Sequence, residues 1–162
     1  MARSDPASVY RVAMPSPIEV SEVIDVTPDV VAAFARLIPQ LSSSNPAPDA
    51  GALAAMARSD ASIILVARDV EHGREIVGSL TLVVFRIPTG VRAWIEDVVV
   101  DEAARGRGVG EALNRAALDR ARTAGATTVD LTSRPSRASA NRLYQRLGFV
   151  ERETNVYRYQ FD

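Results

Sequence analysis

The chain has 162 residues, 47% of them apolar and 24% charged, which is the composition of a globular domain. Its formal net charge of −1 gives no reason to expect binding to nucleic acid or to a membrane surface. The absence of cysteine excludes a disulfide framework, a thiolate nucleophile and a zinc-thiolate site, and the single histidine, His72, excludes a histidine metal cluster. We therefore expect no metal site.

The N-terminal part shows no pattern of a targeting or membrane segment. No stretch of the chain approaches the roughly 20 apolar residues of a membrane span, and the apolar core of a signal peptide is missing. The default expectation is a cytoplasmic protein. Residues 1–17 contain three prolines and lack periodicity, so we expect a flexible extension there, followed by a single domain over residues 18–162.

Alternation and helical periodicity define the elements expected in the first half. They are a strand at residues 18–24, a helix at 28–38, a short helix at 50–58, and strands at 63–68 and 76–87. The segment between the two helices is polar and rich in proline, and is expected to be a loop. Short turns join the last two strands to a further strand through residues 94–100, so these three should form an antiparallel meander.

The second half alternates helices and strands. It contains a helix at residues 109–124, a strand at 127–132, a helix at 136–147 and strands at 149–150 and 155–161. Gly125 is a natural C-terminal stop for the first of these helices. The strand after that helix should run parallel to the strand before it, in a βαβ crossover. The order of elements predicts a mixed α/β fold.

A glycine-rich turn directly follows an acidic strand at residues 94–110, which read WIEDVVVDEAARGRGVG. Backbone N–H groups in such a turn can converge on an anion, and the N-terminus of the helix that follows adds roughly half a positive charge. The spacing of the glycines is neither G-x-G-x-x-G nor a Walker loop, and the chain has no lysine. The pattern indicates a phosphate-bearing cofactor held beside a proton acceptor.

Two motifs carry a resemblance to a known family. Arg105-x-x-Gly108-x-Gly110 resembles the R/Q-x-x-G-x-G/A signature of the GNAT superfamily of acyl-CoA-dependent N-acetyltransferases. Asn141-x-x-Tyr144-x-x-x-Gly148-Phe149 resembles a second segment of the same superfamily. The resemblance implies the GNAT fold, a central, mostly antiparallel mixed sheet of six to seven strands flanked by about four helices. It also implies that the sheet splays between its fourth and fifth strands.

The resemblance further implies acetyl-CoA as the acyl donor. The pantetheine would pair with the main chain of Val98 and Val100 in the gap between the splayed strands. The diphosphate would lie on the turn and the helix start, and the asparagine of the second motif would also contact the cofactor. The residues expected to bind acetyl-CoA are therefore Val98, Val100, Arg105, Gly106, Arg107, Gly108, Val109, Gly110 and Asn141.

Glu96 and Asp97 are the candidates for the general base. They lie in a strand that is apolar on both faces, so at least one carboxylate should be forced toward the interior, where burial raises a carboxylate pKa. Alternation puts Glu96 on the face of Trp94 and Val98 and puts Asp97 on the other face, although a bulge could exchange them. An ion pair with Arg92 is the structural alternative for either acid. The family resemblance favours Glu96.

Tyr144 completes the expected catalytic set. In the family this tyrosine protonates the departing CoA thiolate; the alternative is a core aromatic with its hydroxyl at the rim. The implied function is transfer of acetyl from acetyl-CoA to a primary amine, by direct attack in a ternary complex.

The acceptor is expected to be a small-molecule amine. An anionic acceptor could be bound by Arg86, Arg92 or Arg134, and loop 39–50 is either a connector or part of the acceptor site. A peptide or protein amine is the rival substrate, and a non-catalytic acyl-CoA sensor is the alternative from another class. A homodimer formed through the strand at 155–161 is also open.

Overall fold

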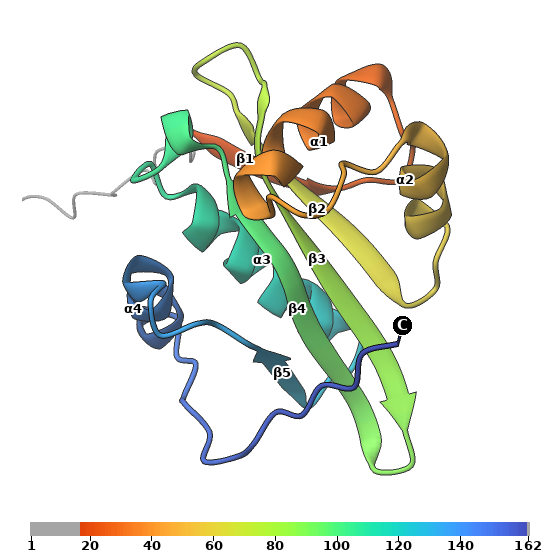
Figure 1. The fold of residues 1–162 in the computed structure, drawn as a ribbon, viewed down its shortest axis with the longest axis vertical. Coiled ribbons are helices and arrows are strands. Elements are labelled where there is room, and N and C mark those ends of the chain that lie inside the picture. Colours follow the sequence, from red (N-terminus) through yellow and green to blue (C-terminus); the bar gives the residue numbers. More distant parts are fainter. Residues whose placement is uncertain (1–16, 162) are drawn as a thin grey trace, which may run out of the picture.

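The computed structural model describes residues 17–161, so the expected N-terminal extension lies almost entirely outside the described residues. The described part contains one open sheet in which the strands lie in chain order (Figure 1). The strands are β1 (Ile18–Glu22), β2 (Ser62–Asp69), β3 (Ile76–Ile87), β4 (Gly90–Val100) and β5 (Thr128–Leu131). The first four are antiparallel neighbours, and β5 runs parallel to β4 as the crossover rule predicts.

Helices cover both faces of this sheet. They are α1 (Pro28–Leu41), α2 (Ala50–Ala57), α3 (Val109–Thr123) and α4 (Ala138–Arg146), with a short 3-10 turn at Glu102–Ala104. Strand β2 shows how the two layers arise, because successive side chains point to opposite faces. Leu65 and Ala67 join the cluster under α3, whereas Ile64 and Val66 join the cluster under α1 and α2. Burial on both faces explains why β2 has an almost continuous apolar sequence.

A glycine lets α3 approach the sheet closely. A Cβ atom at Gly78 of β3 would lie 2.8 Å from Cγ1 of Val109 and 3.0 Å from the carbonyl oxygen of Val99. Only a residue without a side chain fits between β3 and the first turn of α3. Gly78 therefore helps to fix where the glycine-rich turn and the start of α3 lie relative to β4.

The expected sixth and seventh strands are not formed, and the described sheet has five strands. Residues 149–161 follow α4 without any ladder pairing in the described part of the chain. Phe149 packs against the core, but the large apolar side chains after it are exposed: Val150, Val156, Tyr157, Tyr159 and Phe161. Alternating apolar residues predict which side chains of a strand would share a face. A strand forms only if its backbone N–H and C=O groups can also pair with the edge of a neighbouring strand.

No helix in the described range 17–161 has the length and apolar character needed to cross a membrane.

Candidate active site

A cleft opens where β4 and β5 separate. The two strands pair over residues 92–95 and 128–131, and β4 then continues to Val100 without a partner on that side. A cavity of about 110 Å³ lies at this divergence. Its lining comes from the end of α1, from β4, from β5 and the residue after it, and from α4 with its N-cap: Leu41, Ile95, Glu96, Asp97, Val98, Leu131, Thr132, Arg137 and Tyr144.

Strand β4 has a bulge at the two acids. Thr81 of β3 is opposite Glu96 and Ser79 is opposite Val99, so Asp97 and Val98 together face a single residue of β3. Asp97 has a φ of 51°, in the left-handed region that an aspartate enters at lower cost than most residues. The extra residue reverses the alternation of the strand beyond this point.

The bulge changes the face of Val98 relative to Glu96, whereas Glu96 stays on the face of Trp94 as expected. Ile95, before the bulge, and Val98, after it, both pack with the cluster under α3, whereas Val99 packs under α1. Val98 therefore lies on the opposite face from the one predicted, and Glu96 shares its face with Val99. Because Asp97 is the inserted residue, both carboxylates line the cavity.

Neither acid is buried, so the expectation that one would be forced inward is wrong. The bulge releases the strand from strict alternation, and this allows both side chains to reach the cleft. Oε1 of Glu96 accepts a hydrogen bond from the indole Nε1 of Trp94 at 2.7 Å, which fixes the direction of the carboxylate. The Asp97 side chain has no hydrogen bond or ion pair within residues 17–161, and Arg92 instead donates to Thr127 Oγ1 at 2.5 Å.

Tyr144 enters the cavity from α4. Its side chain is 7% exposed, and its ring meets the ring of Phe149 edge to face with centroids 5.8 Å apart. Burial raises the pKa of the Tyr144 phenol above its usual value, and the positive charge of Arg137 acts in the opposite direction. The phenol is therefore a group that stays protonated beyond its ordinary range.

The glycine-rich turn has the geometry expected of an anion cradle. Gly106 and Gly108 have φ values of 76° and 81°, and Gly108 is the N-cap of α3. In the part of the chain that the structure describes, the backbone N–H groups of residues 106–108 donate to no protein acceptor. A Cβ atom at Gly110 would lie 3.2 Å from Leu143, so this glycine allows α4 to approach the start of α3.

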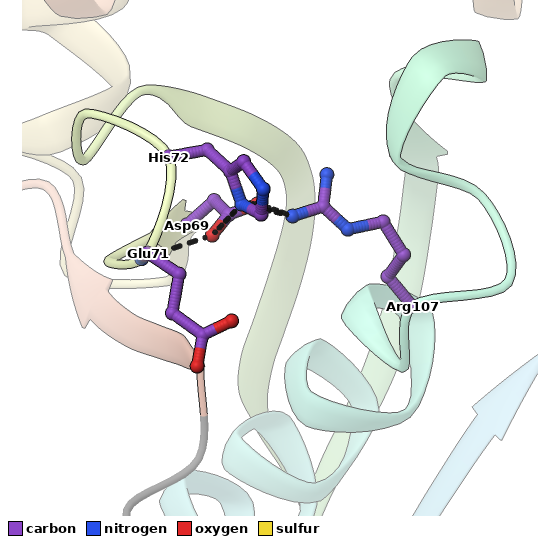
Figure 2. A network of polar contacts seen from close by, with 4 residues as sticks. All are labelled: Asp69, Glu71, His72 and Arg107. Carbon is purple, nitrogen blue, oxygen red and sulfur yellow. Dashed lines mark hydrogen bonds and ion pairs between the residues drawn. The ribbon is translucent and has the colours of Figure 1, made fainter.

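The two arginines of the turn have different surroundings. Arg105 is exposed, and its side chain has no partner among the described residues. Arg107 instead directs one guanidinium nitrogen toward Asp69 at the end of β2 and toward His72 in the following turn (Figure 2). Both arginines were expected to add positive charge at the diphosphate site, but the structure distinguishes them.

Asn141 lies in the first turn of α4. Its Nδ2 donates to the carbonyl oxygen of Arg134 at 3.1 Å and so ties the helix to the loop before it. The main chain of Val98 and Val100 lies on the stretch of β4 that β5 leaves unpaired. The expected donor-binding residues thus occur in three places: along this unpaired edge, in the turn and first residues of α3, and, for Asn141, in the first turn of α4.

Sequence reasoning missed Arg137, and the three arginines it suggested for an anionic acceptor lie outside the cavity. None of Arg86, Arg92 and Arg134 lines the cavity, whereas Arg137 at the N-cap of α4 does. Arg86 lines a separate hollow at the other end of the sheet. Arg137 gave no signal of its own, because it is one of two arginines in the segment between β5 and α4 and nothing in the sequence distinguishes it from Arg134. Loop 39–50 contributes only its first part, since α1 extends to Leu41 and that residue reaches the cavity.

No group of three or more His, Cys, Asp and Glu side chains within residues 17–161 is placed to hold a metal ion.

Comparison with known proteins gives this arrangement a class. A family model described as the acetyltransferase (GNAT) family matches residues 30–149. Over 136 residues the chain is 34% identical to glucosamine 6-phosphate N-acetyltransferase 1 of Oryza sativa subsp. japonica, and the match covers 79% of each protein. The fold and these matches define an acetyltransferase.

Solved structures agree with that class. An acetyltransferase from Trypanosoma brucei superposes with a TM-score of 0.71 at 25% identity, covering 88% of this chain and 99% of that one. An aminoglycoside acetyltransferase, meta-AAC0020, from an uncultured soil metagenomic sample shares the fold, with a TM-score of 0.77 at 18% identity over 91% of this chain and 99% of that one. The chain belongs to the GNAT family of acetyltransferases.

Proposed function

We propose that the protein transfers the acetyl group of acetyl-CoA to the primary amine of a small molecule, by direct attack in a ternary complex. One observation carries the proposal. Where β4 leaves β5, a single cavity is lined by two carboxylates and by a buried phenol from α4. A proton acceptor and a proton donor on different walls of one cavity are what acyl transfer to an amine requires.

The residues present fit acetyl-CoA. The N–H groups of residues 106–108 and the start of α3 would hold the diphosphate, and Arg105 would add charge. The unpaired edge of β4 at Val98 and Val100 offers main-chain groups to the pantetheine amides. Asn141 and the rest of the α3 start complete the expected binding set. The donor supplies an activated acetyl thioester, and the chain supplies positioning and proton transfer.

Glu96 is the proposed base. An alkylamine has a pKa near 10.4 and is mostly protonated at neutral pH, so it must lose a proton before it attacks. The Glu96 carboxylate is directed by the Trp94 indole and lines the cavity, so it can take that proton directly or through one water molecule. Asp97 is the second candidate, because its side chain lines the same cavity and has no partner within residues 17–161.

Tyr144 is the proposed acid. As the C–N bond forms and the C–S bond breaks, its phenolic proton passes to the departing sulfur, and the ammonium proton has already passed to Glu96. The nitrogen of the new C–N bond gives its remaining surplus proton, directly or through water, to the Tyr144 phenolate, and Glu96 releases the first proton to solvent. Arg137, on the same wall, would stabilise negative charge as it develops there.

A small-molecule amine is the proposed acceptor, because the relative from Oryza sativa is by name a sugar-phosphate N-acetyltransferase. The cavity has negative charge on its β4 wall and positive charge on its α4 wall, which suits an ammonium group that is accompanied by an anionic group. The test below can instead identify a peptide amine as the acceptor, or show that the protein binds acyl-CoA without turnover, as a sensor would.

The test has a binding arm and a turnover arm. Calorimetry with acetyl-CoA, NAD and ATP should show binding of acetyl-CoA alone, and binding of NAD or ATP without acetyl-CoA would reject the donor assignment. Release of free CoA thiol is then followed over a panel of amino sugars, amino sugar phosphates, polyamines, aminoglycosides and N-terminal peptides. Turnover of peptides alone would replace the acceptor class, and binding with no turnover over the panel would favour a sensor.

Paired variants test the base. Glu96→Gln should lower kcat/KM for a good amine by about 10²-fold or more, the usual scale of positioned general-base catalysis. Asp97→Asn is the matched control, since it neutralises the adjacent carboxylate and keeps a residue that tolerates a positive φ. If Asp97→Asn were inactive and Glu96→Gln active, and both proteins were folded and bound acetyl-CoA, Asp97 would be the base instead of Glu96.

A further inference from the structure

The buried carboxylate of Asp69 lies outside the active site but is joined to the glycine-rich turn. Asp69 is 0% exposed and ends β2. Its Oδ1 accepts the backbone N–H of Glu71 at 3.2 Å, and both of its oxygens lie 3.1 Å from Nδ1 of His72 (Figure 2). Its cationic partner is Arg107, which comes from the turn that precedes α3.

This pairing follows from the cost of burying charge. A carboxylate removed from water needs hydrogen bonds and a counter-charge, and the neighbouring backbone supplies only one hydrogen bond here. The side chain of His72 is 65% exposed, so the histidine shields one side only. The Arg107 guanidinium provides the counter-charge, and its charge is therefore largely committed to Asp69.

The position of Arg107 in the turn makes this contact important. It stands between Gly106 and Gly108, both of which have positive φ, and a backbone of this kind has many accessible conformations. Arg107 is the residue between those two glycines. The contact of its side chain with Asp69, at the end of β2, therefore restrains the middle of the turn. The free N–H groups of residues 106–108 are restrained with it.

We propose that Asp69 is a positioning residue for the donor-binding turn. By holding Arg107, it fixes the backbone N–H groups that receive the diphosphate, and the positive side chain at that site is Arg105 and not Arg107. The proposal rests on the proposed function, because it assumes a diphosphate-bearing donor. It also replaces the direct role that the sequence indicated for Arg107.

The sign of one substitution distinguishes the two roles. If Arg107 bound phosphate directly, Asp69→Asn would release the guanidinium and remove a nearby negative charge, so acetyl-CoA would bind more tightly. If Asp69 positions the turn, Asp69→Asn should weaken acetyl-CoA binding by about tenfold, the scale at which outer partners act on the affinity of ligating groups. Unchanged or tighter binding overturns the proposal.

A comparison of donors separates positioning from a general loss of structure. KM for acetyl-CoA should rise in Asp69→Asn and Arg107→Gln, with kcat at saturation preserved and KM for S-acetylpantetheine, which lacks the diphosphate, unchanged. The double variant should lose no more affinity than either single variant, because both break one connection. Equal losses for both donors, or additive losses, would contradict the proposal.

Glu19→Gln is the matched control. It neutralises an acid that pairs at 2.6 Å with Arg74, in the turn between β2 and β3 that follows Asp69, but both side chains of this pair are more than half exposed. Its acetyl-CoA affinity should equal that of the wild type. A loss as large as that of Asp69→Asn would show that any nearby charge matters and would overturn the proposal.

A measurement on the unsubstituted protein covers the case in which the variants do not fold. The ¹⁵N signals of the Arg107 guanidinium should be unchanged by saturating CoA if Arg107 remains on Asp69, while the backbone amide signals of residues 106–108 shift. Large shifts of the guanidinium itself would assign Arg107 to the phosphate. An unsubstituted protein that does not bind CoA overturns the proposed function as well, whereas binding with unaffected variants overturns only this inference.

Discussion

Tyr144 combines two opposing influences in one side chain. Burial favours the neutral phenol, and the nearby guanidinium of Arg137 favours the phenolate. Burial is the larger influence, so the folded protein holds the proton more firmly than the unfolded chain does. A proton donor with this property remains loaded through the neutral and mildly alkaline range.

The pH dependence of turnover should reflect this. Because burial raises the pKa of Tyr144 above its usual value, kcat should not fall between pH 7 and 9. Its contribution to stability is complete below the unfolded pKa and is lost as the pH rises through the folded pKa. Tyr144→Phe should lower kcat by about 10²-fold or more and leave the acetyl-CoA Kd within a few-fold.

The measurement is a pH profile of kcat for both proteins, together with Kd from calorimetry. Wild-type kcat in Tyr144→Phe would assign the ring to the core alone. Arg137→Gln is a useful companion, because loss of the positive charge should move any alkaline decline to still higher pH.

The residues of the site were predictable to different degrees. Glu96, Asp97 and Tyr144 follow from motif and spacing, and the structure brings all three to one cavity. The prediction that one acid would be buried was wrong. The bulge that exposes both acids arises from the pairing of β4 with β3, and the sequence of β4 alone does not indicate it. The partner of Arg107 was not predictable either, since Asp69 is 38 positions away and the pair forms only after the sheet and α3 have packed.

At the scale of elements, the contact between α3 and β3 determines the geometry at the start of α3. Gly78 leaves no room for a side chain, because a Cβ there would also lie 3.1 Å from Leu113 of α3. Any displacement of this helix moves its N-terminus and the turn before it. The contact therefore links packing in the core to the expected diphosphate site.

Gly78→Ala should destabilise the protein by about 1–3 kcal/mol, the usual cost of overpacking a core. The groups that a Cβ at residue 78 would meet cannot easily move away from it, because Val109 has a stiff β-branched side chain and the Val99 carbonyl is part of the backbone. The denaturation midpoint in urea, at unchanged m, is the measurement. Gly51→Ala in α2 is the control and should show a smaller loss, because Gly51 is exposed and a Cβ there would meet only Oδ1 of the N-cap residue Asp49, at 3.3 Å, and no core or backbone atom.

The elements with strong periodicity were predicted almost to the residue. The expected strand at 76–87 coincides with β3, and the expected helix at 109–124 differs from α3 by one residue. Helix α1 continues past the expected stop at Pro39, because a proline near a C-terminus removes one hydrogen bond and the chain still closes the turn from Ser42 to Ile38 at 2.9 Å.

For the whole molecule, the sequence predicted the mixed α/β order and the direction of β5, but not the state of the last 13 described residues. The segment 155–161 alternates as a strand would, with Tyr157, Tyr159 and Phe161 on one side. These side chains are 83–88% exposed, so the pattern is present without the burial that usually accompanies it. Alternation shows that a segment could form a strand. Whether it does depends on whether the unpaired edge of another strand lies beside it.

The short ladder between β4 and β5 divides the molecule into parts of unequal stability. Strand β3 pairs with neighbours on both sides, whereas β5 has four residues and pairs with β4 alone, and Tyr144 is the one buried residue of α4. Native-state hydrogen exchange should therefore find that amides of β2 and β3 exchange only through global unfolding, while those of β5 and α4 exchange through a local opening of lower free energy. Uniform protection across the sheet would contradict this.

A unit that opens by itself would move the wall that carries Tyr144, so substrates could enter and products leave while the rest of the fold remains closed.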